Sequence, residues 1–195
     1  MGRTKTDNSF LSDKVAMRAA HLPPDPVRVL DCYAGRGTIW RCVAELTKRD
    51  IVTLPIDTRD LGFFHLPGDN TRYMETLDLS RFNVLDLDAY GVPYEQLRIA
   101  FSRGFQGYVF VTFIQSMYGG VNYGLLADLG FSGDMVKLCP TVFAKNGWAY
   151  FLEWLALNGV RRIWHRSHAG KHYLHFVTGE GPAPDALAAL QSLPA

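Results

Sequence analysis

Residues 29–40 read VLDCYAGRGTIW, an apolar run that ends in an acid and then passes through two glycines. The apolar run, 27–31, is short and continuous, as in a strand buried on both faces of a parallel sheet. Residues 34–37 form a predicted tight turn, because glycine adopts backbone conformations that other residues avoid. A predicted helix over 38–48 and a predicted strand over 51–56 follow. This order is that of a βαβ unit.

The rest of the chain continues the alternation of strands and helices. Its pattern predicts an α/β domain with a doubly wound, mostly parallel sheet. We expect one domain over residues 1–178, with a helical segment over 1–24, and a tail or short helix over 179–195. Residues 59–74 are rich in turn formers and receive no assignment. The further predicted elements are a helix within 10–22, strands over 82–87 and 108–114, helices over 94–103 and 140–158 (the latter interrupted near Gly147), and a hairpin of 161–167 with 172–177.

The composition is that of a folded protein without a strong overall charge. Of 195 residues, 48% are hydrophobic and 20% are charged, and the formal net charge is +1 at pH 7. This excludes a globally basic protein, so any contact with nucleic acid must come from a local patch. The cysteines, Cys32, Cys42 and Cys139, show no C-x-x-C spacing and predict neither a disulfide framework nor a structural zinc site. A polar start and the lack of a long apolar stretch predict a cytoplasmic protein without membrane contact.

The glycine turn has the features of a site for a charged ligand. Gly35 and Gly37 let the backbone approach a ligand without a Cβ clash, and N–H groups at the following helix start can bind a carboxylate. Asp31 ends its strand where ligands bind in open α/β sheets. The segment resembles the first motif of class I methyltransferases, which bind S-adenosylmethionine. The resemblance implies a Rossmann-like, seven-stranded sheet closed by a C-terminal antiparallel hairpin. It places the cofactor at Asp31, Tyr33, Ala34, Gly35 and Gly37.

Asp57 supports this interpretation. It ends the second strand, twenty positions after the second glycine, at the separation expected of a carboxylate that binds ribose hydroxyls. Trp40 stands where a dinucleotide-binding turn needs a small residue, which favours S-adenosylmethionine over a nicotinamide cofactor. Asp69 and Asn70 lie in a turn that resembles the family's adenine-contacting segment. The alternatives are an ordinary capped strand-to-helix turn for the glycines and a surface turn for Asp69.

Residues 82–93 read FNVLDLDAYGVP and contain the predicted catalytic groups. Asp86 and Asp88 alternate at a strand end, so both carboxylates point to one side. The segment resembles the fourth motif of amino-methyltransferases and, more narrowly, that of the tRNA guanine-N2 dimethyltransferase family, which has proline in place of Ala89. The resemblance implies that Asp88 binds an acceptor amine and takes its proton, that Asp86 orients Asp88 or touches the cofactor, and that Tyr90 stacks on a flipped base. In the alternative interpretation, Asp86 and Asp88 are caps at a junction between a strand and a helix, and Tyr90 belongs to the core. The resemblance covers about residues 27–118, and Ala89 leaves the base specificity open.

One stretch near the C-terminus is strongly basic and contains aromatic residues. Its cations can pair with phosphates while its rings offer stacking faces, so we predict nucleic-acid contacts there. The residues are Arg161, Arg162, Arg166 and Lys171. A solvated hairpin is the alternative. The same stretch contains several histidines, but no cysteine or acid stands near them at the spacing of metal ligands. No metal site is therefore predicted.

Three functional hypotheses result. The first is an S-adenosylmethionine-dependent methyltransferase that acts on an exocyclic amine of a nucleic-acid base, in RNA such as tRNA or in DNA. The second is the same enzyme acting on a protein or small-molecule amine. The third is a non-catalytic nucleic-acid-binding relative of the fold. The base, the methylated atom and the oligomeric state stay open.

Overall fold

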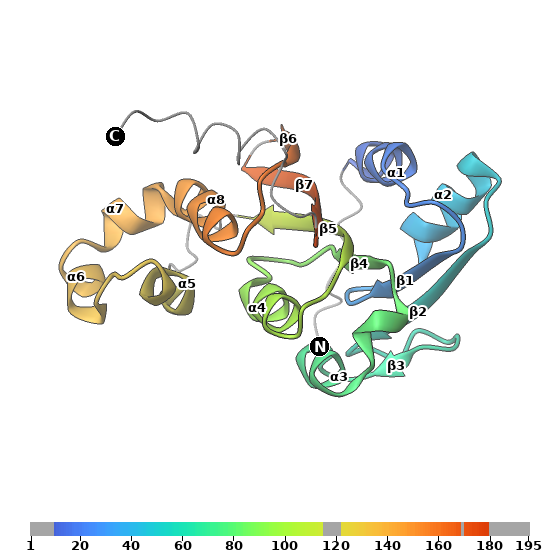
Figure 1. Ribbon diagram of the computed structural model, residues 1–195, viewed down its shortest axis with the longest axis horizontal. Coiled ribbons are helices and arrows are strands. Elements are labelled where there is room, and N and C mark those ends of the chain that lie inside the picture. Colours follow the sequence, from blue (N-terminus) through green and yellow to red (C-terminus); the bar gives the residue numbers. More distant parts are fainter. Residues whose placement is uncertain (1–9, 115–121, 169, 180–195) are drawn as a thin grey trace, which may run out of the picture.

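A computed structural model of the chain describes residues 10–114, 122–168 and 170–179. Its strands form one seven-stranded sheet in the order β3-β2-β1-β4-β5-β7-β6 (Figure 1). They are β1 (Val27–Asp31), β2 (Ile51–Asp57), β3 (Leu66–Pro67), β4 (Val84–Leu87), β5 (Gly107–Ile114), β6 (Trp164–His168) and β7 (Lys171–Thr178). The first five strands pair in parallel, whereas β7 is antiparallel to both β5 and β6. The predicted α/β sheet with its C-terminal antiparallel hairpin is confirmed.

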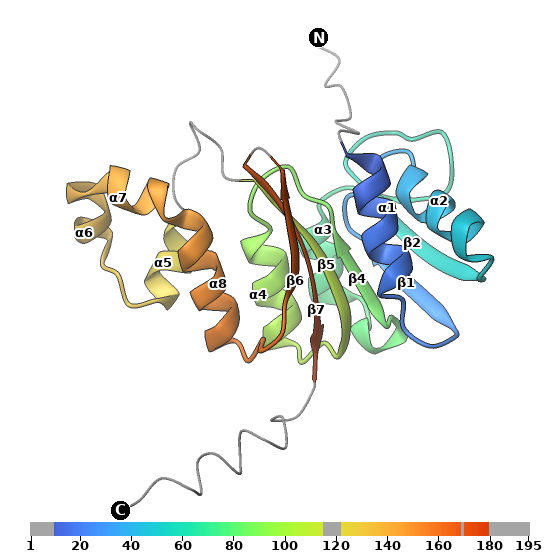
Figure 2. The same ribbon diagram turned by 90° about the horizontal axis from the view of Figure 1, so that it is seen from above.

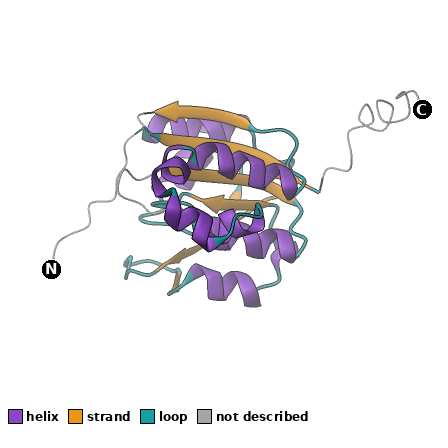
Figure 3. Cartoon of the chain, turned by 90° about the vertical axis from the view of Figure 1, so that its left-hand side faces the viewer, coloured by secondary structure: helices purple, strands orange, loops and turns teal. Residues whose placement is uncertain are grey.

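Helices cover both faces of this sheet. They are α1 (Leu11–Ala20), α2 (Thr38–Thr47), α3 (Asn70–Thr76), α4 (Tyr94–Ser102), α5 (Tyr123–Asp128), α6 (Gly133–Leu138), α7 (Pro140–Lys145) and α8 (Gly147–Leu157). Figure 2 shows the sheet between α1 and α2 on one side and α4 and α8 on the other. In Figure 3 the helices lie in front of and behind the strands, which run across the view. The result is the three-layer arrangement of a doubly wound fold.

Alternation along the central strands sends side chains to the two faces. On the face of α1 and α2, Val29, Val84 and Phe110 form a core with Trp40 of α2 and Tyr173 of β7. The intervening residues of the same strands point to the other face, where they pack with α4 and α8. Both faces of the central strands are therefore buried, as parallel strands require.

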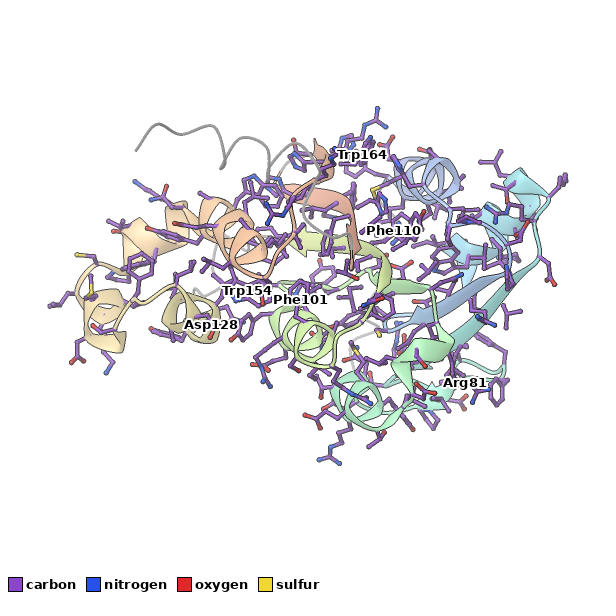
Figure 4. The ribbon with its side chains drawn as sticks, in the orientation of Figure 1. Arg81, Phe101, Phe110, Asp128, Trp154 and Trp164 are labelled. Carbon is purple, nitrogen blue, oxygen red and sulfur yellow. The ribbon has the colours of Figure 1, made fainter. Side chains whose placement is uncertain are left out.

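One carboxylate joins three helices on the second face. Figure 4 shows Asp128 of α5 beside Trp154 of α8, with Phe101 of α4 close to that ring. Trp154 Nε1 and Tyr94 Oη each donate a hydrogen bond of 2.8 Å to Asp128 Oδ2. Beyond this anchor, α6 and α7 extend away from the sheet (Figure 1).

The predicted elements agree with the structure except in a few places. The helix predicted over 140–158 consists of α7 and α8, which meet at Asn146, next to the glycine where the sequence predicts an interruption. β3 and α3 lie in the segment that received no assignment, and the sequence did not predict α5 or α6. Residues 180–195, where a tail or short helix is predicted, lie outside the described residues. No helix in the described part has the length and hydropathy to cross a bilayer.

Candidate active site

A cavity of about 940 Å³ lies at the carboxyl ends of the parallel strands. Its walls come from the turn after β1, the end of β2, the segment after β4, the end of β5, the start of β7 and helix α1. In open α/β sheets this edge is where ligands bind, because the strand order reverses there and leaves a crevice. The chain therefore brings the two segments with predicted function to one cavity.

The glycine turn forms one wall of the cavity. Gly35 and Gly37 have φ of 54° and 64°, which are left-handed values that side chains with a Cβ rarely adopt. Gly37 is the N-cap of α2, and no side chain among the described residues caps this helix. The first N–H groups of α2 are thus open to a ligand, and Thr38 beside them lines the cavity together with Tyr33 and Ala34. These residues fit the carboxylate end of S-adenosylmethionine.

Asp31 lies behind this wall and not on it. Its side chain is buried next to Asp86, its partner in the β1–β4 register, and is not among the groups that line the cavity. The Tyr33 N–H lies 3.4 Å from Asp31 Oδ1, which makes a weak hydrogen bond. Burial, followed by the charge on Asp86, raises the pKa of Asp31 well above its usual range. A cationic ligand group would relieve this electrostatic cost.

We expect Asp31→Asn to stabilise the ligand-free protein and to weaken cofactor binding. Because the pKa of Asp31 is raised in the folded state, the folded protein binds more protons than the unfolded chain above about pH 4, so stability falls as pH rises. The gain in unfolding free energy should be about 1 kcal/mol at pH 8 and smaller at pH 4. Thermal denaturation at both pH values measures it. An equal gain in unfolding free energy at pH 8 and at pH 4 would contradict a buried charge at Asp31.

Asp57 reaches the cavity, but its carboxylate already has partners. Arg59 donates from Nε to Oδ1 and from Nη2 to Oδ2, both over 2.9 Å, and the Gly35 N–H donates to Oδ2 over 2.9 Å. Burial alone would raise the pKa of Asp57, but these hydrogen bonds lower it below the usual value. About half of the Arg59 side chain is exposed, so it can move aside. Ribose hydroxyls would have to compete with it for the carboxylate.

We therefore expect Arg59→Ala to tighten binding of S-adenosylhomocysteine. An ion pair this exposed contributes at most about 1 kcal/mol, so the dissociation constant should fall about three- to fivefold. Titration calorimetry measures the change. Arg81→Ala, which removes an exposed arginine from the short turn before β4 (Figure 4), is the matched control and should leave the dissociation constant unchanged. Weaker binding by the Arg59 variant would mean that the arginine itself contacts the ligand.

Of the two residues predicted to contact adenine, Asp69 lies away from the cavity and Asn70 lines it. Asp69 caps α3 by accepting hydrogen bonds from the Thr71 N–H and hydroxyl over 2.9 and 2.7 Å, and it does not line the cavity. Asn70 does line it, and its amide donates to the Cys32 carbonyl and accepts from Gln96, both over 2.7 Å. Asn70 thereby fixes the end of β1 against α3. The capping geometry of Asp69 is that of an ordinary turn residue.

Asp86 is a buried counter-ion. Arg18 of α1 donates from Nε and Nη2 to its two oxygens over 2.7 and 2.6 Å, and Trp40 Nε1 donates to Oδ2 over 2.7 Å. The side chains of Arg18 and Asp86 are 0% and 1% exposed, so water cannot replace either partner. The chemistry of Asp86 is therefore that of a structural group beneath the cavity.

Asp88 lines the cavity and stays ionised. Lys14 Nζ lies 2.8 Å from Oδ2, and the Thr112 hydroxyl donates to Oδ1. Burial alone would raise the pKa of Asp88, but the charges on Arg18 and Lys14 and the hydrogen bonds lower it below the usual value. Tyr90 lines the same cavity with 82% of its surface exposed, which excludes a core role and leaves its ring open to stacking. Both residues thus lie on the cavity, and their acceptor-binding roles stay predictions.

The predicted nucleic-acid contacts lie at different ends of the sheet. Lys171 begins β7 at the edge of the cavity, whereas Arg166 pairs with Asp13 of α1. Arg161 and Arg162 precede β6, which is parallel to β5, so they lie toward the opposite edge of the sheet. Only part of the basic stretch thus faces the cavity.

Sequence reasoning missed four groups that complete the site. They are Lys14 and Arg18 of α1, Thr112 of β5 and Arg59 after β2. The sequence does contain a signal for the two cations of α1. Residues four positions apart on a helix are separated by about 6 Å along its axis, and residues two positions apart on a strand are separated by about 6.6 Å. Lys14 and Arg18 therefore match Asp88 and Asp86 in spacing. Nothing local to Thr112 or Arg59 marks them.

Several solved structures of methyltransferases are similar to this chain at low sequence identity. A Clostridium thermocellum protein described as an rRNA methylase superposes with a TM-score of 0.50 at 12% identity, over 86% of this chain and 94% of that one. The precorrin-6y C5,15-methyltransferase of Geobacter metallireducens gives 0.46 at 12% identity, over 91% and 92%. A methyltransferase of Podospora anserina with bound S-adenosylhomocysteine gives 0.45 at 15% identity, over 87% and 78%.

The chain thus has the Rossmann-like fold of class I methyltransferases. At such identities the likeness establishes the fold alone. No protein-family model and no curated protein matches the sequence. The narrower resemblance to the tRNA guanine-N2 dimethyltransferase family stays a prediction.

Proposed function

We propose that this protein is an S-adenosylmethionine-dependent methyltransferase. One observation supports this most strongly: a single cavity joins the uncapped, glycine-lined start of α2 to the ionised carboxylate of Asp88 after β4. A cofactor held at the first position would present its reacting group toward the second. The shared cavity gives the proximity that group transfer requires.

The protein's own groups would have three tasks in this reaction. The N–H groups at the start of α2 bind the cofactor carboxylate, and Asp57 binds the ribose once Arg59 has moved. The buried charge of Asp31 favours the cationic part of the ligand. When bound, S-adenosylmethionine would supply an electrophilic methyl group, because the positively charged sulfur to which it is attached is a good leaving group. Asp88 orients the acceptor, because its carboxylate is fixed by Lys14 and Thr112.

We further propose a nucleic-acid nucleotide as the acceptor. Exposed Tyr90 beside Asp88 suits stacking on an unpaired base, and Lys171 at the cavity edge suits a phosphate. The sequence motif makes an exocyclic amine of a base the first candidate for the methylated group, since Asp88 can accept its N–H hydrogen bonds. A hydroxyl oxygen is the second candidate, which Lys14 favours as argued below.

Titration calorimetry with S-adenosylhomocysteine tests the cofactor assignment. We expect micromolar binding by the wild-type protein and its loss in Gly37→Val, because a β-branched residue distorts a turn that needs a positive φ. Gly104→Val is the matched control, since Gly104 has φ of 65° against 64° for Gly37 but lies away from the cavity. It should lose similar stability and keep binding. No binding by the wild-type protein would refute the proposed function.

A further inference from the structure

A lysine ammonium occupies the position where the acceptor should bind. Lys14 Nζ lies 2.8 Å from Asp88 Oδ2, and only 7% of this lysine is exposed. Nζ also lies 5.6 Å from the centre of the Tyr173 ring, which favours a cation at that point. All three residues line the cavity. An acceptor that hydrogen-bonds Asp88 is therefore within reach of a positive charge.

This charge distinguishes between possible acceptor atoms. A nitrogen gains positive charge as it bonds to the methyl carbon, so a nearby ammonium opposes an amine acceptor. A hydroxyl oxygen gains negative charge as its proton leaves, so the same ammonium stabilises it. Asp88 gives an amine little help in losing its proton, because the neighbouring cations lower the pKa of Asp88 and make it a weak base.

The cavity also indicates what kind of molecule carries the hydroxyl. Its lining includes four cationic side chains, Lys14, Arg36, Arg59 and Lys171, against two acidic ones, Asp57 and Asp88. Such an excess of positive charge favours a substrate with phosphate groups. Within a nucleic-acid chain the hydroxyl that lies between phosphates is the ribose 2′-hydroxyl, which RNA has and DNA lacks.

We propose that the acceptor is a ribose 2′-hydroxyl of RNA and that Lys14 is the catalytic residue that stabilises its oxygen. This inference rests on the proposed function and specifies its substrate. Asp88 then acts as a positioning residue, because its carboxylate holds the ammonium in place while Thr112 holds the carboxylate.

In the proposed methyl transfer, water accepts the proton of the hydroxyl group. The hydroxyl loses its proton to solvent water, and the oxygen keeps the electron pair of that bond. The oxygen then forms a bond to the methyl carbon while the carbon–sulfur bond breaks, and the electron pair of that bond stays on sulfur. The negative charge of the oxygen and the positive charge of the sulfonium are both removed. Lys14 takes no part in the proton transfer.

The position of the transferred methyl group tests this proposal. The full chain is incubated with methyl-labelled S-adenosylmethionine and either total RNA or total DNA, and the products are digested to nucleosides and fragmented by mass spectrometry. We expect label in RNA, on the ribose fragment. Label on the base fragment, or in DNA to the same extent, would overturn the hydroxyl proposal and leave the methyltransferase proposal standing. Binding of S-adenosylhomocysteine without transfer to RNA would also overturn it.

Variants at Lys14 test its role separately. Lys14→Met should lower transfer at pH 7.5 about 100-fold and move the rise of rate with pH upward by about one to two units, because the cation no longer favours loss of the hydroxyl proton. Lys14→Arg should restore part of the rate and the original pH profile. Lys145→Met, on the exposed surface of α7, is the control. A slower Lys14→Met enzyme with an unshifted profile would show a merely structural role.

Discussion

Arg18→Met is expected to lower the free energy of unfolding by about 3–5 kcal/mol, the cost of leaving a buried carboxylate without its partner. Within the part of the chain that the structure describes, the Asp86 carboxylate would keep only the Trp40 hydrogen bond, in a place where its side chain is 1% exposed. Chemical denaturation monitored by tryptophan fluorescence measures the loss. For a chain of this size the melting temperature should fall by about 6–20 °C.

A double variant separates the ion pair from general packing. Arg18→Met combined with Asp86→Leu replaces both charges by apolar groups, so most of the lost stability should return. Asp25→Asn, which removes an exposed carboxylate from its ion pair with the half-buried Arg49, is the control and should change stability by less than about 1 kcal/mol. A double variant no more stable than Arg18→Met alone would show that the cost does not come from the unpaired charge.

Asp88→Asn should lower methyl transfer by about 100-fold, as much as the loss of Lys14 itself, while leaving cofactor binding nearly intact. The variant keeps the shape of the side chain but removes the charge that holds Lys14 and orients the acceptor. Steady-state transfer assays with labelled cofactor give the rate, and calorimetry with S-adenosylhomocysteine gives the affinity. The substitution changes no residue of the glycine turn, so the dissociation constant should change less than about threefold.

A second variant checks that the effect comes from the carboxylate. Thr112→Val removes the hydrogen bond to Asp88 Oδ1 and keeps the charge. It should therefore cost about 10-fold in rate, the low end of the effect of one hydrogen bond to a charged group, and less than Asp88→Asn. An Asp88→Asn enzyme as active as the wild type would remove Asp88 from the reaction. It would also remove the main argument for the acceptor position.

The sheet and the position of the cavity could be predicted because their signals are local. The apolar strand ending at Asp31, the glycines and the helix after them lie within twenty residues of one another. The turn forms locally, because Gly35 and Gly37 readily adopt the left-handed φ values that it requires. The Asp86–Asp88 alternation likewise fixed which carboxylates share a face.

The partners of those carboxylates could not be predicted in the same way. Arg18 and Asp86 are 68 positions apart, and cations on an otherwise amphipathic helix ordinarily face water. The sequence pattern favoured the apolar residues of α1 as its packing side, yet Lys14, Met17 and Arg18 are its most buried positions. The acids therefore differ in role: Asp86 is neutralised beneath the cavity and Asp88 is available to it.

Helices α5 and α6, the first two after β5, were missed for another reason. Residues 123–138 form two six-residue helices, which are too short to show an apolar period clearly. They depend on tertiary contacts, such as those of Asp128 with Trp154 and Tyr94. Contacts of this kind join residues far apart in the chain, so they cannot be predicted from the sequence of the helices themselves.

The strand order also determines how this sheet meets other chains. A strand at the border of a sheet has unpaired backbone groups that invite an additional strand, and thereby aggregation. Here one border is β3, which has two residues and includes Pro67, and proline cannot donate a ladder hydrogen bond. The other is β6, whose side chains, Arg166 among them, are mostly exposed and polar. Both borders are thus poor templates, which protects a mostly parallel and slowly forming sheet from pairing with its neighbours.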